Sequence, residues 1–300
     1  MPQSKDIQTE IGYYSFETGQ KPFVFTRQRH EHEKENFPAD STEELDPCVE
    51  PVTIYDGRHR DLTLDKHSFQ RFDAPTSMSR QDFFDPDKLK NVYFKEVKDL
   101  MKKATGAKEV IIFNHFVRCK ELVNGTLQDH HDTTLTFSSV IHTDSHPWSA
   151  ERTRRHFVKE TGRPELANCR VLYLTSWRNI NDTPVLNNHL VMADEASITK
   201  PDDVVVRDQY SFDDQLGDYY ILQYGLNNGN AKRHKWYYYP GLTRQEVILH
   251  KQYDSDFDRP ARLCFHTSAP DPTAPANNPC RASVEVRGLC FFPQESNGHA

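Results

Sequence analysis

The chain has 300 residues and carries 37 Lys and Arg against 44 Asp and Glu, which gives a formal net charge of −7 at pH 7. An acidic chain lacks the positive field typical of nucleic-acid binders, and no stretch approaches the roughly 18 consecutive apolar residues of a membrane-spanning helix. The 6 Cys form no C-x-x-C pair, so their spacing indicates neither a zinc ribbon nor a redox motif.

Residues 1–50 are polar and are predicted to form an irregular arm. His30 and His32 have H-x-H spacing there, but the charged surroundings favour a solvated segment. The first residues lack the basic and then apolar pattern of a signal peptide, so a cytoplasmic location with reduced thiols is expected. Residues 51–295 are predicted to form one domain with helical elements near its start, and residues 296–300 a tail.

Two short apolar pieces between residues 52 and 72, VTIYD and LTLDKHSFQRF, are predicted to be the first strands. The clearest helix is predicted over residues 85–105. Asp85 can cap this helix, Pro86 suits its first position and Gly106 can end it. Its apolar residues recur at helical spacing, so the helix is expected to cover one face of a sheet.

The chain after Gly106 is rich in short apolar runs separated by turns. WSAERTRRHFVKET is predicted to be a short amphipathic helix, and Thr243 with Glu246 matches a capping box, which indicates one helical turn before a strand. The Pro-rich stretch 269–279 is expected to be a loop between the last two strands. Many short strands with few helices favour a sandwich or a closed barrel of two sheets. The predicted strands include EVIIFNHF, TLTFSSVIH, CRVLYLTSW, DYYILQYGL, RLCFHTSA and ASVEVRGLCFF.

The sharpest chemical motif is His142-Thr143-Asp144, at the end of the predicted strand TLTFSSVIH. Side chains alternate along a strand, so His142 and Asp144 would share a face and could bind one divalent metal, with His266 as the best third ligand. Two His and one carboxylate with open positions are typical of non-haem Fe(II) oxygenases. On this motif alone, a hydrogen-bonded polar pair remains an equal alternative. A second H-x-D motif, His130 and Asp132, lies in a polar segment and is interpreted as a solvated loop.

Arg281 and Ser283 form an R-x-S motif at the start of the last predicted strand. A guanidinium and a hydroxyl on one strand face can bind the same carboxylate, as a site for the distal carboxylate of 2-oxoglutarate requires. Arg287 has the same parity and is a second candidate for this role. The alternative for either arginine is a surface ion pair, with Glu285 nearby. The sequence leaves open which arginine is the principal anchor.

Four further residues are weaker candidates for the same site. Asn114 and Arg118 lie on or after the strand that precedes the metal motif, where they could reach the cosubstrate. Tyr173 and Trp177 share one face of the strand CRVLYLTSW and could line a substrate pocket, although core packing explains them equally well.

The order of these motifs resembles one family of fungal and bacterial enzymes. The resemblance runs from about residue 52 to 293, and the KQYDS and S-x-E-V-R pieces are specific to it. It is the hydroxylase/desaturase family that includes the aspergillic-acid hydroxylase/desaturase, the fungal gibberellin desaturase and a cephamycin 7α-methoxylation component. The motifs that carry it are FNHFVR, VIHTD, YLTSWR, HKWYYYPGLTRQEVILHKQYDS, ARLCFHTSAPDP and RASVEVRGLCFF.

The resemblance implies a mainly β fold with flanking helices around a double-stranded β-helix, the jelly-roll or cupin-like core. It also implies a dioxygenase that uses Fe(II), 2-oxoglutarate and O₂, with ascorbate as a possible reductant, to hydroxylate or desaturate a small natural product. Carried over by position, the iron ligands would be His142, Asp144 and His266, and the 2-oxoglutarate site would be Arg281 with Ser283. Trp177 with Arg178 would match a Trp-Arg pair usual in the family, and Arg178 and Arg118 are further candidates for the substrate pocket.

Some residues depart from the family pattern. Asn179 stands where the family usually has Pro, and Ala282 where it commonly has an acidic residue. Neither removes a ligand, so the substrate is in greater doubt than the reaction class. Three alternatives remain: a jelly-roll iron enzyme that acts without 2-oxoglutarate, a non-catalytic binding subunit, and a zinc hydrolase. The expected partner is a small-molecule substrate, and a homodimer is possible.

Overall fold

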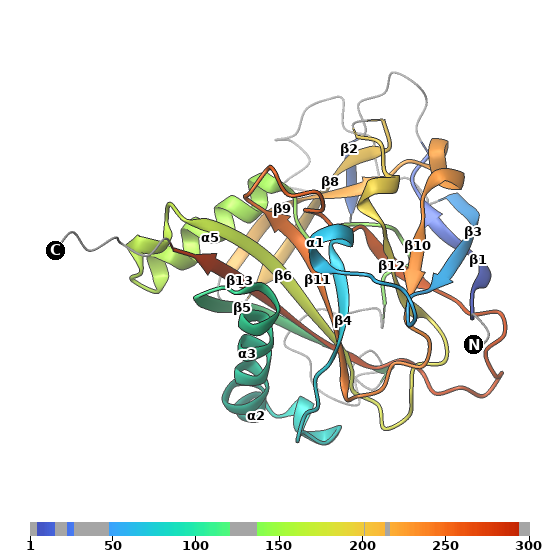
Figure 1. The fold of residues 1–300 in the computed structure, drawn as a ribbon, viewed down its shortest axis with the longest axis horizontal. Coiled ribbons are helices and arrows are strands. Elements are labelled where there is room, and N and C mark those ends of the chain that lie inside the picture. Colours follow the sequence, from blue (N-terminus) through green and yellow to red (C-terminus); the bar gives the residue numbers. More distant parts are fainter. Residues whose placement is uncertain are drawn as a thin grey trace.

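The computed structural model describes residues 5–15, 23–26, 48–120, 137–200, 202–213 and 217–293. Within these residues the fold is mainly β with few helices, as the sequence predicts, and its sheets form a barrel-like arrangement (Figure 1). No helix in the described part of the chain is both long enough and apolar enough to span a membrane.

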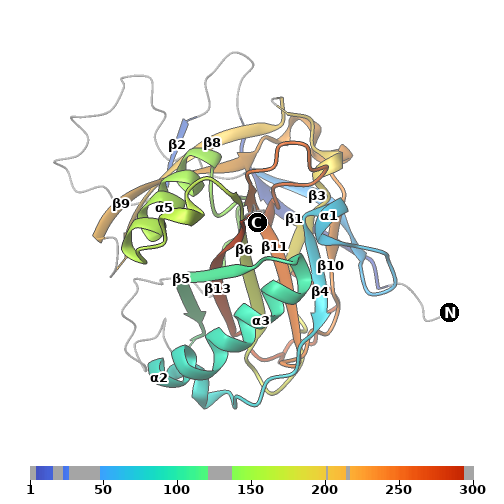
Figure 2. The same ribbon diagram turned by 60° about the vertical axis from the view of Figure 1, so that its left-hand side comes forward.

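Two five-stranded sheets build the barrel, and a three-stranded sheet extends from it (Figure 2). Apolar side chains of both large sheets share one core cluster, which includes Trp177 and Ile248 from one sheet and Leu190 and Met192 from the other. The first sheet has the order β1 (Ile7–Tyr13), β3 (Cys48–Asp56), β10 (Trp236–Tyr238), β7 (His189–Ala193) and β12 (His266–Ala269). The second has the order β4 (Phe69–Asp73), β11 (Glu246–Asp254), β6 (Arg170–Asn179), β13 (Ser283–Phe292) and β5 (Glu109–Arg118), and the third β2 (Phe23–Thr26), β8 (Val204–Asp213) and β9 (Gly217–Leu226).

The predicted helix over residues 85–105 is confirmed, with one irregularity. Asp85 caps it by accepting from the backbone N–H groups of Asp87 and Lys88, and Gly106 ends it at a φ of 76°. The helical path runs through α2 (Pro86–Lys88), a π-helical turn at Leu89–Tyr93 and α3 (Phe94–Thr105).

Helix α3 packs against β5 and β13, on the outer side of the second sheet (Figure 2). Gly288 permits this close approach, because a Cβ there would stand 2.9 Å from the sulfur of Met101. The same glycine follows Arg287 at a register shift between β13 and β5, so the pairing of β13 is irregular beside Arg287.

The remaining helices are short, apart from α5 (Pro147–Glu160), which confirms the helix predicted at WSAERTRRHFVKET. His146 caps α5 by accepting from the N–H of Trp148. The others are α1 (Leu64–His67), η2 (Gln81–Phe84), η4 (Pro164–Leu166), η5 (Glu195–Ser197) and η6 (Asn228–Arg233).

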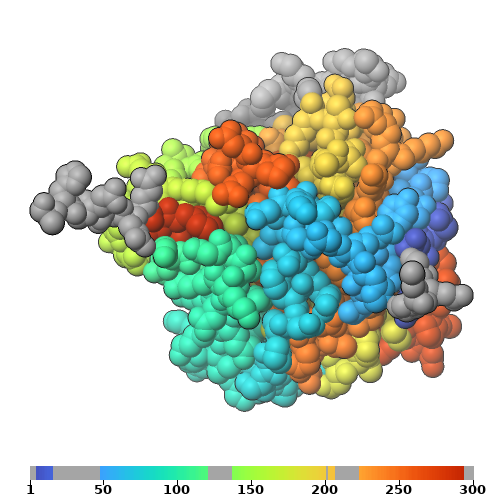
Figure 3. Space-filling model, viewed as in Figure 1, coloured from blue at the N-terminus to red at the C-terminus, as the bar shows by residue number. Residues whose placement is uncertain are grey.

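The N-terminal segment corrects the prediction of an irregular arm. Residues Ile7–Tyr13 form β1, which pairs antiparallel with β3 along its whole length. Its alternating burial shows a strand with one face against the core, and β3 in turn pairs with β10 from the far end of the sequence. Figure 3 shows the result: blue N-terminal residues share one surface with orange residues of the C-terminal half. His30 and His32 lie outside the described residues.

Four local predictions are also wrong in part. LTLDKH forms the turn of α1, because Thr63 accepts from the N–H of Lys66 and caps a helix there. Residues 137–142 make only isolated bridges instead of a regular strand, and the earlier part of TLTFSSVIH lies outside the described residues. Glu246 does accept from the N–H of Thr243 at 2.9 Å, but it closes a turn and not a helix. Strand β12 begins at His266, so RLCF precedes it, and residues 270–282 form the expected loop before β13.

Candidate metal centre

His142 and His266 face each other across a single antiparallel bridge. His142 donates its backbone N–H to the carbonyl of His266 at 3.0 Å, and His266 donates to the carbonyl of His142 at 2.9 Å. Residues paired in this way carry their side chains on the same face of a sheet. The two imidazole centroids accordingly lie 4.5 Å apart.

Both imidazoles have the same nitrogen available for a metal. Nδ1 of His142 lies 2.8 Å from the carbonyl oxygen of Val140, and Nδ1 of His266 lies 3.0 Å from that of Cys264. A carbonyl oxygen only accepts, so each Nδ1 carries the proton and each Nε2 keeps its lone pair. Histidines that bind metals are usually oriented by such a bond.

The carboxylate of Asp144 completes the cluster. Its Oδ1 lies 3.9 Å from Nε2 of His142 and 3.7 Å from Nε2 of His266. These separations are too long for direct hydrogen bonds. Both are below about 4.2 Å, the largest separation that two ligand atoms can have on one metal ion with bonds of about 2.1 Å, and the ligand atoms of the three residues all lie within 4.8 Å of one another. The structure therefore brings together the three residues predicted as ligands.

Asp144 is held as a buried carboxylate. Thr175 donates to its Oδ2 at 2.8 Å, and Nη2 of Arg287 donates to its Oδ1 at 2.9 Å. Burial alone would raise the pKa of the Asp144 carboxyl, but Arg287 and the imidazoles of His266 and His142 outweigh burial and hold the pKa below its usual range. The group is therefore ionised and ready to bind a cation.

Arg281 and Ser283 lie buried next to this centre, with donors that remain unused. Nη1 of Arg281 donates to the carbonyl of Asn188 at 2.6 Å and lies 3.4 Å from Oγ of Ser268. Within the described residues, Nε of Arg281 and Oγ of Ser283 have no hydrogen-bond partner. Burial lowers the pKa of Arg281 to about 10, so the guanidinium still carries its charge at neutral pH.

The surface ion-pair alternative for the two arginines is wrong. Arg281 is 6% exposed and Arg287 8% exposed, so neither is a surface residue. Glu285 instead accepts from Arg118 at 3.2 Å. Arg118, predicted to reach the cosubstrate, is thus engaged at the end of β5, whereas Arg287 is engaged by Asp144.

Side chains alternate between the two faces of β6, and this places the other predicted residues relative to Asp144. Trp177 lies on the same face as Thr175, and the guanidinium carbon of Arg281 sits 5.5 Å from its ring centroid. Tyr173 shares that face but packs in an aromatic core cluster, with its ring 5.1 Å from that of Phe113. Asn114 on β5 is the register partner of Arg287, so the two share a face of the sheet.

Arg178 does not contact the candidate centre. It points to the opposite face of β6, where Nε donates to the hydroxyl of Tyr93 at 3.1 Å and Nη1 donates to the carbonyls of Ala74 and Arg244. Its position beside helix α2–α3 indicates a structural role, so its prediction as a pocket residue is wrong.

A second group of possible ligands overlaps the first. His250, Cys264 and His266 are all buried and could also surround an ion. However, Nδ1 of His250 is already hydrogen-bonded to Gln252 at 2.7 Å, and burial raises the pKa of the Cys264 thiol well above its usual range. His142, Asp144 and His266 are the better metal site.

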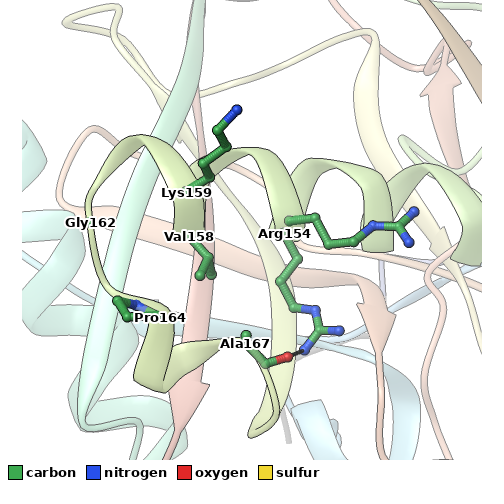
Figure 4. A pocket seen from close by; sticks show the side chains of 7 residues that line it. Arg154, Val158, Lys159, Gly162, Pro164 and Ala167 are labelled. Carbon is green, nitrogen blue, oxygen red and sulfur yellow. Dashed lines mark hydrogen bonds between the residues drawn. The ribbon is translucent and has the colours of Figure 1, made fainter.

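A surface groove of about 390 Å³ lies elsewhere, along α5 and the turn that follows it (Figure 4). Arg154, Val158, Lys159, Pro164 and Ala167 are among its lining residues, and Nη1 of Arg154 donates to the carbonyl of Ala167. None of the residues of the metal cluster lines this groove, so it has no part in the site described here.

Comparison with known proteins agrees with this geometry. A family model described as an oxidoreductase/YMDC permease-like domain matches residues 11–291. The alpha-ketoglutarate-dependent dioxygenase tstK of Talaromyces stipitatus is 32% identical over 237 residues, which cover 77% of this chain and 80% of tstK. The hydroxylase/desaturase efuI of Hormonema carpetanum is 29% identical over 260 residues, which cover 82% of this chain and 85% of efuI. The chain belongs to the hydroxylase/desaturase family of Fe(II)/2-oxoglutarate-dependent dioxygenases.

A solved structure shares the fold of this dioxygenase. The iron and alpha-ketoglutarate-dependent endoperoxidase NvfI superposes with a TM-score of 0.74 at 21% identity, over 98% of this chain and all of that one. The same protein from Aspergillus novofumigatus is 27% identical over 253 residues in sequence.

Sequence reasoning missed the groups of the dioxygenase that hold Asp144 and His266. Gln252 accepts from the backbone N–H of Asp144 at 2.7 Å, and Thr175 holds its carboxylate. Gln252 falls inside the KQYDS motif, and His250 two residues earlier shares its parity. The spacing of His250 and Gln252, which puts both on one strand face beside a family motif, was therefore the sequence signal that could have indicated these two residues.

Proposed function

We propose that this enzyme uses Fe(II), 2-oxoglutarate and O₂ to hydroxylate or desaturate a small natural product in secondary metabolism. The names of its relatives support the reaction and the substrate class, since they include the hydroxylase/desaturase efuI and an aspirochlorine biosynthesis protein of Aspergillus oryzae. The observation that carries the reaction class is the convergence of two imidazole Nε2 atoms, from the half-buried His142 and the buried His266, on the buried carboxylate of Asp144.

Iron would be held by Nε2 of His142, Nε2 of His266 and the carboxylate of Asp144. Two imidazoles and one carboxylate are the donor set of non-haem Fe(II) oxygenases, in which three positions remain open. The metal bound there supplies redox activation of O₂, with oxidative decarboxylation of 2-oxoglutarate to succinate and CO₂ as the source of electrons. The chain fixes the imidazole tautomers and keeps Asp144 ionised through Arg287.

The second carboxylate of 2-oxoglutarate would bind to Arg281 and Ser283. Arg287 already neutralises Asp144, whereas Arg281 forms no ion pair among the described residues and has a buried Nε without a partner. Arg281 also reaches Ser268, two residues beyond His266 on β12, which is about 7 Å along the strand. That spacing suits a five-carbon diacid stretched from the metal to Arg281. In a buried site, a guanidinium of this kind stabilises a carboxylate strongly.

The two five-stranded sheets are proposed to form a double-stranded β-helix. In support, the two sheets share one core cluster, His266 begins β12 of the first sheet, and Asp144 accepts a hydrogen bond from Thr175 on β6 of the second. A barrel of this kind places a small buried site inside and keeps water from it.

The decisive experiment is anaerobic addition of Fe(II) and 2-oxoglutarate to the metal-free protein. We expect a weak visible charge-transfer band, followed by succinate formation on admission of O₂ with ascorbate present. The absence of both signals contradicts the proposal. Turnover without succinate would instead support an iron enzyme that acts without 2-oxoglutarate.

A further inference from the structure

Gln252 links two residues of the metal centre without belonging to it. Its Oε1 accepts from the backbone N–H of Asp144 at 2.7 Å, and its Nε2 lies 2.7 Å from Nδ1 of His250. The ring of His250 packs nearly edge-on against the ring of His266, with centroids 4.7 Å apart. One side chain thus contacts Asp144 directly and His266 through a single intermediate.

The hydrogen bonds of this chain of residues can run in only one direction. A backbone N–H only donates, so the oxygen of the Gln252 amide must face Asp144 and the NH₂ group must face His250. Nδ1 of His250 therefore accepts, and the imidazole proton lies on Nε2. Each end of the amide is used, and Gln252 is fully buried. The arrangement fixes the orientation of the amide and the tautomer of His250 together.

The backbone around Gln252 is irregular at this residue. The register of β11 against β6 shifts between Lys251 and Tyr253, which pair with consecutive residues of β6 and leave Gln252 as the extra residue of a bulge. β-Bulges occur often beside active sites, where they redirect a side chain. Here Gln252 has no register partner on β6, and its side chain contacts Asp144 and His250.

The peptide of Asp144 is held from its other side as well. Nε2 of Gln223 on β9 lies 3.5 Å from the carbonyl oxygen of Asp144, which is the long limit of a hydrogen bond. Because Asp144 lies outside regular secondary structure, these side chains take the place of a strand neighbour in fixing its backbone.

We propose that Gln252 is a positioning residue of the metal centre, which fixes the Asp144 peptide and, through His250, the ring of His266. The inference rests on the proposed metal site and goes beyond it, because neither Gln252 nor His250 is a ligand in that proposal. Its consequence is that the affinity and symmetry of the bound metal depend on an amide outside the coordination sphere.

Mn(II) alone is the probe that tests this inference. The metal-free protein is titrated with Mn(II) in the absence of 2-oxoglutarate, and electron paramagnetic resonance reports both the bound fraction and the symmetry of the site. In Gln252→Met both hydrogen bonds are lost, so we expect Mn(II) to bind about 10–100-fold more weakly with an altered spectrum. In Gln252→Glu the acceptor for the Asp144 N–H remains and the donor to His250 is lost, so we expect a smaller loss of several-fold.

Ser176→Ala is the matched control, since Ser176 is equally buried on the opposite face of β6 and its hydroxyl has no partner among the described residues. It should leave the Mn(II) affinity unchanged. If Gln252→Met does not fold, Gln252→Glu decides alone. Folded Gln252 variants that bind Mn(II) within twofold of the unsubstituted protein, or that only lower the Tm, overturn the inference. A protein that binds Mn(II) but forms no succinate contradicts the proposed function instead.

Discussion

His142 and His266 exchange both of their backbone hydrogen bonds, at 3.0 and 2.9 Å, although they come from distant parts of the sequence. The pairing fixes the positions of two imidazoles without any contribution from their side chains. Their Nδ1 protons go to carbonyls within two residues along the chain, at Val140 and Cys264. The backbone thus preorganises the two nitrogen ligands, and their loss should affect metal binding far more than folding.

The first prediction concerns His266, whose backbone forms the bridge while its side chain is the proposed ligand. His266→Ala removes one Nε2 and leaves the bridge intact, so Fe(II) or Mn(II) affinity should fall by more than about 100-fold, while the protein remains folded. Metal titration together with thermal unfolding checks both parts. The matched control is the double variant His130→Ala with Asp132→Ala, which removes the other H-x-D motif and should bind metal normally. Equal losses in the two variants would contradict the assignment of His266.

The second prediction separates the two buried arginines. Arg281→Met should raise the KM for 2-oxoglutarate by about 100-fold, equivalent to about 2.7 kcal/mol, because the carboxylate loses its buried charged partner. Metal affinity without 2-oxoglutarate should change little. Arg287→Met should instead weaken metal binding and change the KM for 2-oxoglutarate little, since Arg287 donates to the carboxylate of Asp144. Succinate formation against 2-oxoglutarate concentration, with a parallel Mn(II) titration, distinguishes them. A larger KM effect in Arg287→Met would reverse the assignment.

Local sequence patterns predicted those parts of the fold that depend on neighbours along the chain. Asp85 and Gly106 bound the predicted helix because capping is decided within a few residues. The arm was mispredicted because β1 is stabilised by pairing with β3, which composition does not reveal. Alternation along β6 already implied that Trp177 and Arg178 point to opposite faces, so the pocket role of Arg178 could have been rejected from sequence.

His142, Asp144 and His266 lie together, as the sequence predicts, but not for the reason that the sequence suggested. His142 and Asp144 were expected to share the face of a regular strand. In the structure, an isolated bridge holds His142 and side-chain amides hold the Asp144 peptide. The contacts of Gln252 depend on a bulge and on a partner far away in sequence, so the H-x-Q spacing could relate Gln252 to His250 but not to Asp144.

The third prediction concerns stability in acid and involves Glu246. This carboxylate is 8% exposed, lies 2.8 Å from Arg58 and 2.9 Å from Arg71, and accepts from the N–H of Thr243. Burial would raise its pKa, but the hydrogen bond from Arg58 and those from Thr243 outweigh burial and lower the pKa from 4.5 to about 2. The folded state therefore gives up its proton more readily than the unfolded state.

The lower pKa in the folded state determines how the stability changes with pH. Above pH 4.5 both states are ionised and the full contribution is present, and between pH 4.5 and 2 the unfolded state binds the proton first, so stability is lost as the pH falls. Glu246→Gln should therefore cost about 3 kcal/mol at pH 7, and the cost should shrink toward pH 2. Urea unfolding at several pH values measures this. Glu165→Gln, at an exposed ion pair with Arg163, is the control and should cost nothing measurable. A cost that does not vary with pH would contradict the role of the carboxylate charge.

The fourth prediction tests whether β1 is an integral part of the barrel. Nε1 of Trp236 donates to the hydroxyl of Tyr13 at 2.9 Å, so that hydroxyl must direct its own proton to Nδ1 of His234 at 3.1 Å. The Nε2 proton of His234 then goes to Asp203 at 3.2 Å. Tyr13→Phe leaves a buried indole N–H and a buried imidazole nitrogen without partners.

Such a loss should cost about 1–3 kcal/mol of unfolding free energy. It should also speed hydrogen exchange at the amides of β1, because the hydroxyl of Tyr13 joins that strand to β10 and to the turn that holds His234. Tyr55→Phe is the matched control, since Tyr55 packs its ring against Tyr237 and its hydroxyl makes no hydrogen bond within the described part of the chain. An unfolding free energy within about 0.5 kcal/mol of the unsubstituted protein, with unchanged exchange in β1, would mean that the network does not anchor the strand, since surface-like substitutions produce effects of that size.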